Sequence, residues 1–111
     1  MPLPIDLVLV RHGESESNLA NKRDRAGDSS LINTPGHRER HSSEFRLTDL
    51  GKQQAKAAGD WLKINIDGQF DYCLTSPFIR AIETAGYMDL PGSNWDPIRI
   101  WLSVITANWM Q

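Results

Sequence analysis

The sequence predicts an α/β domain built on a parallel sheet with flanking helices. Branched apolar segments alternate with segments of helical periodicity, in the order strand, helix, strand, helix, strand. Residues that favour helix ends bound the helical segments, and no repeat or low-complexity tract interrupts the pattern. A strand that crosses over through a helix runs parallel to the next strand with a right-handed connection, so this alternation favours a parallel sheet.

The first part of the chain predicts one strand, one short helix and a long loop. Residues 5 to 10, IDLVLV, are typical of a strand buried on both faces, as in parallel sheets. A short helix is expected over residues 14 to 20. Residues 21 to 46 are rich in glycine, proline and serine and predict a long loop insertion. A loop of this length in a small domain is either functional or disordered.

A second helix is expected to begin after Thr48. The hydroxyl of Thr48 is a favourable N-cap, and Asp49 lies at the positive end of the helix dipole. Gly68 is expected to end the segment. The residues expected on the buried face of this helix are Leu50, Ala57, Ala58 and Trp61.

A second strand over residues 70 to 76, FDYCLTS, leads into a third helix. Ser76 is expected to cap this helix, with Pro77 at its first position, where a missing N–H does no harm. Pro91-Gly92 breaks the helix, and residues 97 to 105 predict a third strand. The apolar face of the helix is expected to carry Phe78, Ile82 and Ala85, with Arg80 and Glu83 away from it.

Length, charge and cysteine content narrow the class of protein. The 111 residues fit one small domain, and 12 basic against 14 acidic residues give a net charge of −2. That balance offers no electrostatic case for nucleic acid or an anionic membrane as a partner. The single Cys73 allows no internal disulfide, indicates a reducing compartment and is interpreted as a core residue. With no signal peptide and no membrane span in the sequence, we expect a soluble, cytoplasmic protein.

Residues with charged or reactive side chains follow the first two predicted strands. Arg11 and His12 follow the first strand, and Ser76 and Arg80 follow the second. Ligands of parallel sheets bind beyond the carboxyl ends of the strands, so we expect these residues to converge. Two guanidinium groups and a helix N-terminus suit a phosphate, and Gly13 would let the backbone approach it closely. A histidine there is either a general base or a nucleophile.

Three ordered motifs resemble one known family. They are RHGES over residues 11 to 15 with Asn18 after it, LTDLGKQQA over residues 47 to 55, and TSPFIRAIETA over residues 75 to 85. Together they resemble the histidine phosphatase superfamily, also called phosphoglycerate-mutase-like.

The resemblance implies both a fold and a reaction. His12 would be the nucleophile that becomes phosphohistidine, and Arg11 and Arg80 would hold the phosphoryl oxygens. Asn18 would lie near the substrate, and Gly13 and Ser76 belong to the same expected phosphate site. The implied substrate is a small phosphorylated molecule, and the implied reaction is hydrolysis or transfer of its phosphoryl group.

The sequence also departs from the family pattern. The family's catalytic acid and second pocket histidine have no counterpart here, because no acidic residue follows Asp96 and no histidine follows His41. We interpret residues 1 to 111 as a single, partial domain with an unmatched tail over residues 97 to 111. Turnover is therefore expected to be impaired. The alternative is a truncated, non-enzymatic module that binds phosphate or a partner, and self-association through an exposed sheet edge or the tail is a further expectation.

Plainer roles compete for several of these residues. Arg80 taken alone is more typical of a surface arginine paired with Glu83 or Glu14, and Asn18 is equally typical of a helix cap or a turn. The segment HRERH, residues 37 to 41, differs from the zinc motif H-E-x-x-H in the position of its glutamate. No metal and no cofactor is therefore expected.

Overall fold

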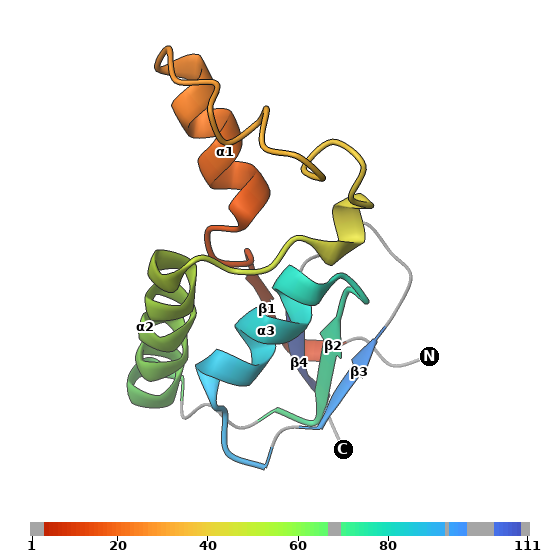
Figure 1. The fold of residues 1–111 in the computed structure, drawn as a ribbon. Helices are drawn as coiled ribbons and strands as arrows, with labels where there is room; N and C mark the ends of the chain where they lie inside the picture. The colour runs from red at the N-terminus through yellow and green to blue at the C-terminus, as the bar shows by residue number, and fades with distance from the viewer. Residues whose placement is uncertain (1–3, 67–69, 93, 98–103, 110–111) are drawn as a thin grey trace.

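The computed structural model describes residues 4–66, 70–92, 94–97 and 104–109, which form a small α/β fold (Figure 1). The elements are β1 (Pro4–Val10), α1 (Glu16–Arg25), the 3-10 helix η1 (Ser42–Glu44), α2 (Asp49–Asn65), β2 (Tyr72–Thr75), α3 (Ile79–Met88), β3 (Trp95–Pro97) and β4 (Val104–Trp109). The predicted α/β class and its alternation of strands and helices are confirmed as far as β3.

The sheet is mixed rather than wholly parallel. Its order is β1-β4-β2-β3, with β2 parallel to β3 and β4 antiparallel to both β1 and β2. The strands β1, β2 and β3 thus run in one direction, as predicted, and β4 is the addition. Only six residues separate Pro97 from Val104, whereas a parallel crossover needs about a dozen or more, so the reversed direction of β4 follows from chain length.

The predicted third strand over residues 97 to 105 is wrong in its bounds. The parallel strand β3 ends at Pro97, and Val104 already belongs to the antiparallel β4. The residues between them, like Gly68, lie outside the described part of the chain.

The first strand is not buried on both faces, as the apolar run predicted. Val8 and Val10 pack against a core of Leu62, Ala81, Met88 and Leu90. Leu7 and Leu9, on the opposite face, are 57% and 60% exposed. The strand β1 therefore packs one face against the core and leaves the other face exposed, although its sequence is apolar throughout.

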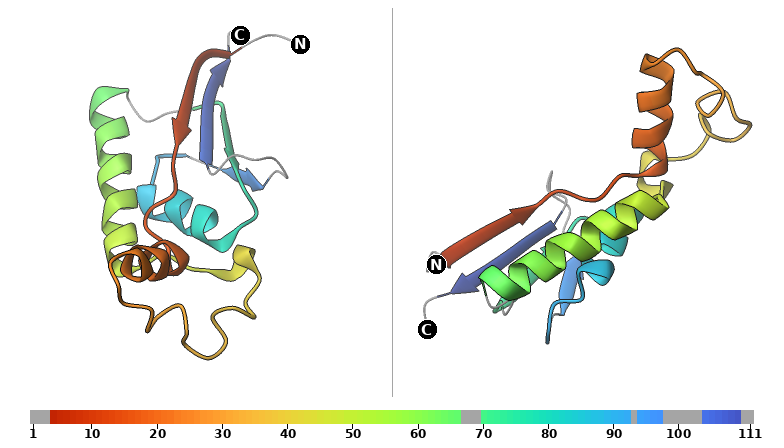
Figure 2. Two further views of the ribbon diagram at one scale, coloured as in Figure 1. Left: turned by 90° about the horizontal axis from the view of Figure 1, so that it is seen from above. Right: turned by 90° about the vertical axis from the view of Figure 1, so that its left-hand side faces the viewer.

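The helices α2 and α3 lie side by side (Figures 1 and 2). They approach through a glycine, since a Cβ on Gly59 would collide with the carbonyl group of Met88. The buried residues of α2 are Gly51, Ala55, Gly59 and Leu62.

The predicted buried face of α2 is therefore wrong except at Ala58, which is partly buried and packs against the core. Leu50 and Trp61 are 47% and 56% exposed, and Ala57 is also exposed. Close approach between the backbones of two helices selects small residues, which a search for large apolar side chains misses.

The apolar face of α3 also differs from the prediction. Its buried residues are Ala81, Thr84, Ala85 and Met88, whereas Ile82 is exposed. Of the predicted face, Ala85 is confirmed as buried and Phe78 is half-buried.

Helix boundaries follow local capping chemistry. The helix α1 runs to Arg25, so it takes five residues of the predicted loop over residues 21 to 46. The prediction for α2 is confirmed, because the Thr48 hydroxyl accepts a hydrogen bond from the Gly51 N–H at 3.1 Å. The helix α3 begins at Ile79 rather than Pro77, and Ser76 Oγ accepts from the Phe78 N–H at 3.2 Å, which places it in the turn before the helix.

Candidate active site

The segment that follows β1 is held by two helices. The Gly13 N–H donates to Thr84 Oγ1 of α3 at 3.1 Å, and the Glu14 N–H donates to Gln54 Oε1 of α2 at 2.9 Å. The Thr48 N–H, just before α2, donates to the Glu14 carbonyl at 2.9 Å. These bonds fix the backbone on both sides of Glu14 and so fix the position of the preceding His12.

Two glycines allow this segment to lie directly on α2. A Cβ on Gly13 would collide with the carbonyl group of Gly51, and a Cβ on Gly51 would collide with the backbone of Glu14. The sequence reasoning assigned Gly13 to the approach of a ligand. The structure gives it a packing role as well, because its open side faces the helix.

The imidazole of His12 is half-buried and fixed in one tautomer. Its Nδ1 lies 2.7 Å from the Gly13 carbonyl oxygen. A carbonyl oxygen only accepts hydrogen bonds, so Nδ1 carries the proton and Nε2 carries the free lone pair. Burial lowers the pKa of His12 below its usual value of 6.5; the hydrogen bond to Gly13 partly opposes this, and the charges of Arg80 and Arg11 lower the pKa further. The ring is therefore neutral at neutral pH.

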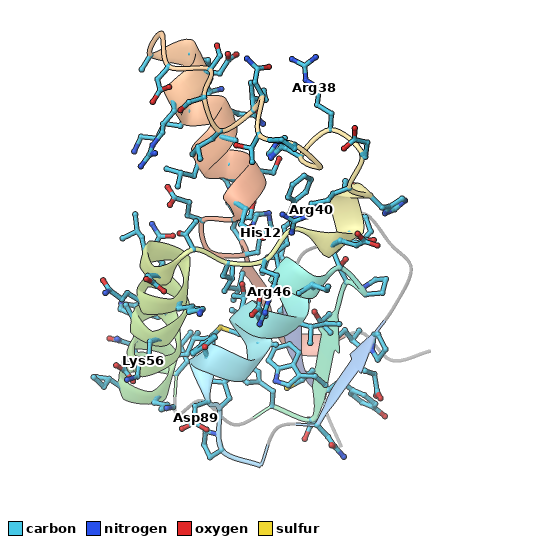
Figure 3. The ribbon with its side chains drawn as sticks, viewed as in Figure 1. His12, Arg38, Arg40, Arg46, Lys56 and Asp89 are labelled. Carbon is cyan, nitrogen blue, oxygen red and sulfur yellow. The ribbon has the colours of Figure 1, made fainter. Side chains whose placement is uncertain are left out.

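A cavity of about 470 Å³ opens beside His12. Its wall comes from the end of β1, from one face of α1 and from α2. The lining residues are Arg11, His12, Glu14, Asn18, Asn21, Lys22, Arg25 and Gln54. Figure 3 shows His12 between the first turn of α1 and the N-terminal ends of α2 and α3.

Arg80 does not line this cavity. It is close enough for its charge to lower the pKa of His12, and its guanidinium group lies 4.6 Å from the centre of the Phe78 ring. It donates a hydrogen bond to the Ser42 carbonyl of η1. The alternative pairing with Glu83 is wrong, because Glu83 instead bonds Arg46 at 3.0 Å.

Thr84 is a site residue that the sequence reasoning missed. Its side chain is fully buried, accepts from the Gly13 N–H and donates to the Arg80 carbonyl at 2.7 Å. It therefore connects the His12 segment to the turn of α3 that carries Arg80. The sequence feature that could have identified it is a threonine four residues after Arg80, on the face of the helix that packs against the core.

Two carboxylates anchor the loop that leads into α2. Glu16 of α1 accepts two hydrogen bonds from Arg40, at 2.8 and 3.2 Å, and one from the Arg46 N–H at 2.8 Å. The hydrogen bond from Arg40 is the main reason that the pKa of Glu16 is lowered. Glu83 of α3 accepts from the Leu47 N–H at 3.0 Å. The loop is thus tied to both helices beside the site.

Comparison with known proteins decides the family. The family model described as "Histidine phosphatase superfamily (branch 1)" matches residues 33–99, more than half of the chain. The chain belongs to the histidine phosphatase superfamily. The match begins after the His12 segment and covers α2, β2, α3 and β3.

Three curated relatives are similar to most of this chain over a quarter to a third of their own length. The chain is 37% identical over 82 residues to "2,3-bisphosphoglycerate-dependent phosphoglycerate mutase 2" of Lactiplantibacillus plantarum, covering 74% of this chain and 28% of that protein. It is 41% identical over 80 residues to "2,3-bisphosphoglycerate-dependent phosphoglycerate mutase" of Allorhizobium ampelinum, covering 72% and 30%. It is 39% identical over 83 residues to "Fructose-2,6-bisphosphatase TIGAR B" of Danio rerio, covering 75% and 25%.

The chain thus spans less than a third of the length of these histidine phosphatase superfamily relatives. No solved structure gives a significant match.

The remaining predicted site residues occupy distinct places. Asn18 lines the cavity and also closes a capping box, because its Oδ1 accepts from the Ser15 N–H and its own N–H donates to Ser15 Oγ. Ser76 is buried in the turn before α3 and is not part of the cavity wall. Cys73 is buried, which raises the pKa of its thiol, and fits the predicted core position.

Within residues 4–66, 70–92, 94–97 and 104–109, no group of three or more histidine, cysteine or acidic side chains could hold a metal. His41 caps η1 and His37 packs against Phe45, so HRERH has structural partners of its own. No helix in the described ranges is long and apolar enough to cross a membrane.

Proposed function

We propose that this chain carries a phosphohistidine site in which His12 accepts a phosphoryl group from a small phosphorylated molecule. The hydrogen bond between His12 Nδ1 and the Gly13 carbonyl carries this proposal. It leaves Nε2 with the lone pair, and burial keeps that lone pair unprotonated at neutral pH. A neutral imidazole held in one orientation is a competent nucleophile toward phosphorus.

The step itself is a displacement at phosphorus. The Nε2 lone pair forms the P–N bond, the P–O ester bond breaks, and the leaving oxygen takes a proton from solvent water. The resulting imidazolium keeps the proton on Nδ1 and donates it in a hydrogen bond to the Gly13 carbonyl oxygen, which stabilises the new positive charge. Attack of water on phosphorus then breaks the P–N bond and regenerates His12, whereas attack by a second hydroxyl gives transfer.

Positive charge near His12 supports the proposed roles of the arginines. Arg11 lines the cavity, and Arg80 would exchange the Ser42 carbonyl for a phosphoryl oxygen. Phosphoryl transfer depends mainly on positioning and charge stabilisation, which guanidinium groups supply. We assign Asn18 to a hydrogen bond from its amide nitrogen to the substrate. We assign Gly13 and Ser76 to the backbone on either side of the phosphate site.

We further propose that turnover by this chain alone is impaired. The sequence has no acidic residue after Asp96 and no histidine after His41 to serve as the family's acid and second pocket histidine. Loss of a general acid costs roughly two to four orders of magnitude in rate. A leaving group that needs no proton should escape much of that loss. The relatives are named as mutases and as a bisphosphatase, so both hydrolysis and transfer fit the proposal.

The second candidate is a phosphate-binding module without turnover. In the described part of the chain, Arg11 forms no ion pair, so its charge is free to bind an anion. The exposed side chains of Leu7 and Leu9 also leave apolar surface on β1 available to a partner or a second copy. Sedimentation equilibrium of the purified chain tests that self-association, and a monomer at all concentrations would exclude it.

Hydrolysis of p-nitrophenyl phosphate tests the enzymatic proposal. The nitrophenolate ion leaves without a proton, so the missing acid matters least. We expect slow hydrolysis that His12→Ala abolishes and His37→Ala preserves, because His37 packs against Phe45 and is absent from the cavity wall. If the unaltered chain, His12→Ala and His37→Ala all show only the background rate of hydrolysis, the enzymatic proposal fails and the phosphate-binding module remains.

A further inference from the structure

The helix α2 carries a second apolar face, on a side that its own fold does not bury. Leu50, Trp61 and Ile64 are 47%, 56% and 81% exposed, and Ala57 is exposed as well. Spacings of seven, four and three residues place these four residues in one row along the helix, which we call the outer face of α2. The buried residues of α2 lie on a different side. In the right-hand view of Figure 2, α2 lies in front of α3, so its outer side faces the viewer.

The outer face of α2 is large enough to mark an interaction surface. At about 200 Å² for a fully exposed large side chain, Leu50, Trp61 and Ile64 together expose roughly 350 Å² of apolar surface. Single apolar residues on a surface need no explanation, whereas a continuous patch of a few hundred Å² marks a contact site. A stable complex buries about 800 Å² on each partner, of which somewhat more than half is apolar. The outer face therefore suits a weak association rather than a permanent one.

A row of charged residues runs beside the outer face. Each member precedes a residue of the outer face by one position, and the signs alternate along the helix, in the order Asp49, Lys56, Asp60 and Lys63. The opposite edge of the face is uncharged and carries Gln54, Ala58 and Asn65. Within one chain these charges are only weakly engaged. The ion pairs of Asp49, Asp60 and Lys63 are 3.9–4.0 Å long, and in the described ranges Lys56 forms none.

The outer face matches itself when two copies of α2 pack in opposite directions. With Ala57 on the two-fold axis, Leu50 lies opposite Ile64 of the second copy, so a leucine and an isoleucine meet at both ends of the contact. The small side chain of Ala57 at the crossing point lets the two helices approach closely. Such a contact is isologous, because each copy uses the same surface, and it closes at two copies.

The charged row also matches itself in this direction. Lys56 lies within about 3 Å, measured along the helix axis, of Asp60 of the second copy, and Asp49 lies within about 3 Å of Lys63 of the second copy. Opposite charges therefore meet along the whole edge. A parallel pair would instead place the charged row against the uncharged edge, where it finds no charged partner. The alternation of charge thus favours the antiparallel arrangement.

We propose that the outer face of α2 binds a second copy of this chain, in an antiparallel pair centred on Ala57. Two acidic and two basic residues balance along the charged row, so the row attracts neither an acidic nor a basic partner, whereas it complements its own reverse. The inference goes beyond the proposed function, because it uses none of the residues assigned to the phosphate site. It also involves a surface other than the apolar residues of β1.

Sedimentation equilibrium tests the pairing with two matched double variants. Trp61→Ser/Ile64→Ser removes apolar groups from the outer face, and Leu7→Ser/Leu9→Ser removes exposed apolar groups from β1. We expect the mass of the unaltered chain to rise toward that of a dimer between about 10 and 1,000 µM, the range of a weak interface. The α2 variant should raise the dissociation constant about tenfold or more, whereas the β1 variant should leave it unchanged. Circular dichroism checks that both variants fold.

A charge exchange tests the charged row. Lys56→Glu brings like charges together across the pair and should raise the dissociation constant about three- to tenfold. The double variant Lys56→Glu/Asp60→Lys restores opposite charges and should restore the affinity. Both effects should shrink as salt screens the charges.

Disulfide formation under diamide tests the direction of the helices. Ala57→Cys should give a crosslinked dimer, because the two copies of this position meet on the axis. Leu50→Cys alone and Ile64→Cys alone should not, since each position lies about 21 Å from its own counterpart along the axis. A mixture of the Leu50→Cys and Ile64→Cys chains should crosslink. The native Cys73 is buried and does not interfere.

Several results would overturn the proposal. A monomer at every concentration would do so, and so would an association that Trp61→Ser/Ile64→Ser leaves unchanged. An equal loss in Leu7→Ser/Leu9→Ser would place the contact on β1 instead. Crosslinking of the Leu50→Cys chain on its own would contradict the antiparallel pair.

Discussion

Replacing Gly51 with alanine tests the backbone contact that positions His12. A Cβ at this position would overlap the carbonyl oxygen, carbonyl carbon and nitrogen of Glu14. The Glu14 backbone cannot simply move away, because Gln54 and Thr48 hold its N–H and carbonyl groups. The substitution must therefore strain the His12 segment or separate it from α2.

The magnitude combines two opposing effects. Overpacking of a fixed contact costs about 1–3 kcal/mol, and this backbone contact should be near the upper end. Alanine gains about 1 kcal/mol over glycine in a helix. We therefore expect Gly51→Ala to lower the free energy of unfolding by about 2 kcal/mol, which corresponds to a fall in Tm of about 8–16 °C.

Gly86→Ala is the matched control, measured by denaturant and thermal unfolding. Gly86 is also helical, in α3, but no atom of the described residues, apart from its chain neighbours and its own helix backbone, lies within 4 Å of a Cβ built there. It should show only the helix gain of about 1 kcal/mol and a higher Tm. If Gly51→Ala is as stable as the unaltered chain, the described packing of the His12 segment on α2 is wrong.

Two further predictions concern charge. His12, followed by NMR titration, should have a pKa below 6.5, and Arg80→Gln should raise it by removing a nearby positive charge. As the pH falls, His12 of the unfolded chain becomes protonated before His12 of the folded chain. The contribution of His12 to stability is therefore complete above pH 6.5 and declines as the pH falls from 6.5 through the folded pKa. A pKa at or above 6.5 in the folded chain would contradict the burial of the ring. Glu83→Gln should lower the free energy of unfolding by about 1 kcal/mol, because it weakens the hydrogen bond from the Leu47 N–H. Arg46→Gln should lower the free energy of unfolding by less, since it leaves the hydrogen bond between Leu47 and Glu83 intact. Equal losses in the two variants would mean that the exposed ion pair between Arg46 and Glu83 dominates.

Local chemistry made parts of the fold predictable. Thr48 caps α2 as expected because one hydroxyl and one N–H suffice for a cap. The strand β1 was evident from its branched residues, and its exposed face was not, because an apolar run does not report which side packs. The start of α3 was misplaced because Ser76 bonds the N–H two residues on, in a turn that resembles a cap in sequence.

Long-range contacts were not predictable in the same way. The buried face of α2 depends on the closeness of Met88 in α3, which favours Gly59 over larger residues. At the site, the adjacency of Arg11 and His12 was visible in the sequence, whereas the link from Gly13 through Thr84 depends on how α3 packs. Asn18 proved to serve both as a helix cap and as part of the cavity wall, roles that a single sequence does not separate.

The most direct test of the account is to identify the phosphorylated nitrogen of His12. The chain is incubated with acetyl phosphate, whose acetate leaves without a proton, and the product is examined by phosphorus and nitrogen NMR with His12→Ala beside it. We predict a phosphoryl group on Nε2 of His12, because Nδ1 is held by the Gly13 carbonyl. Phosphorylation at Nδ1, or no phosphohistidine that depends on His12, would contradict it.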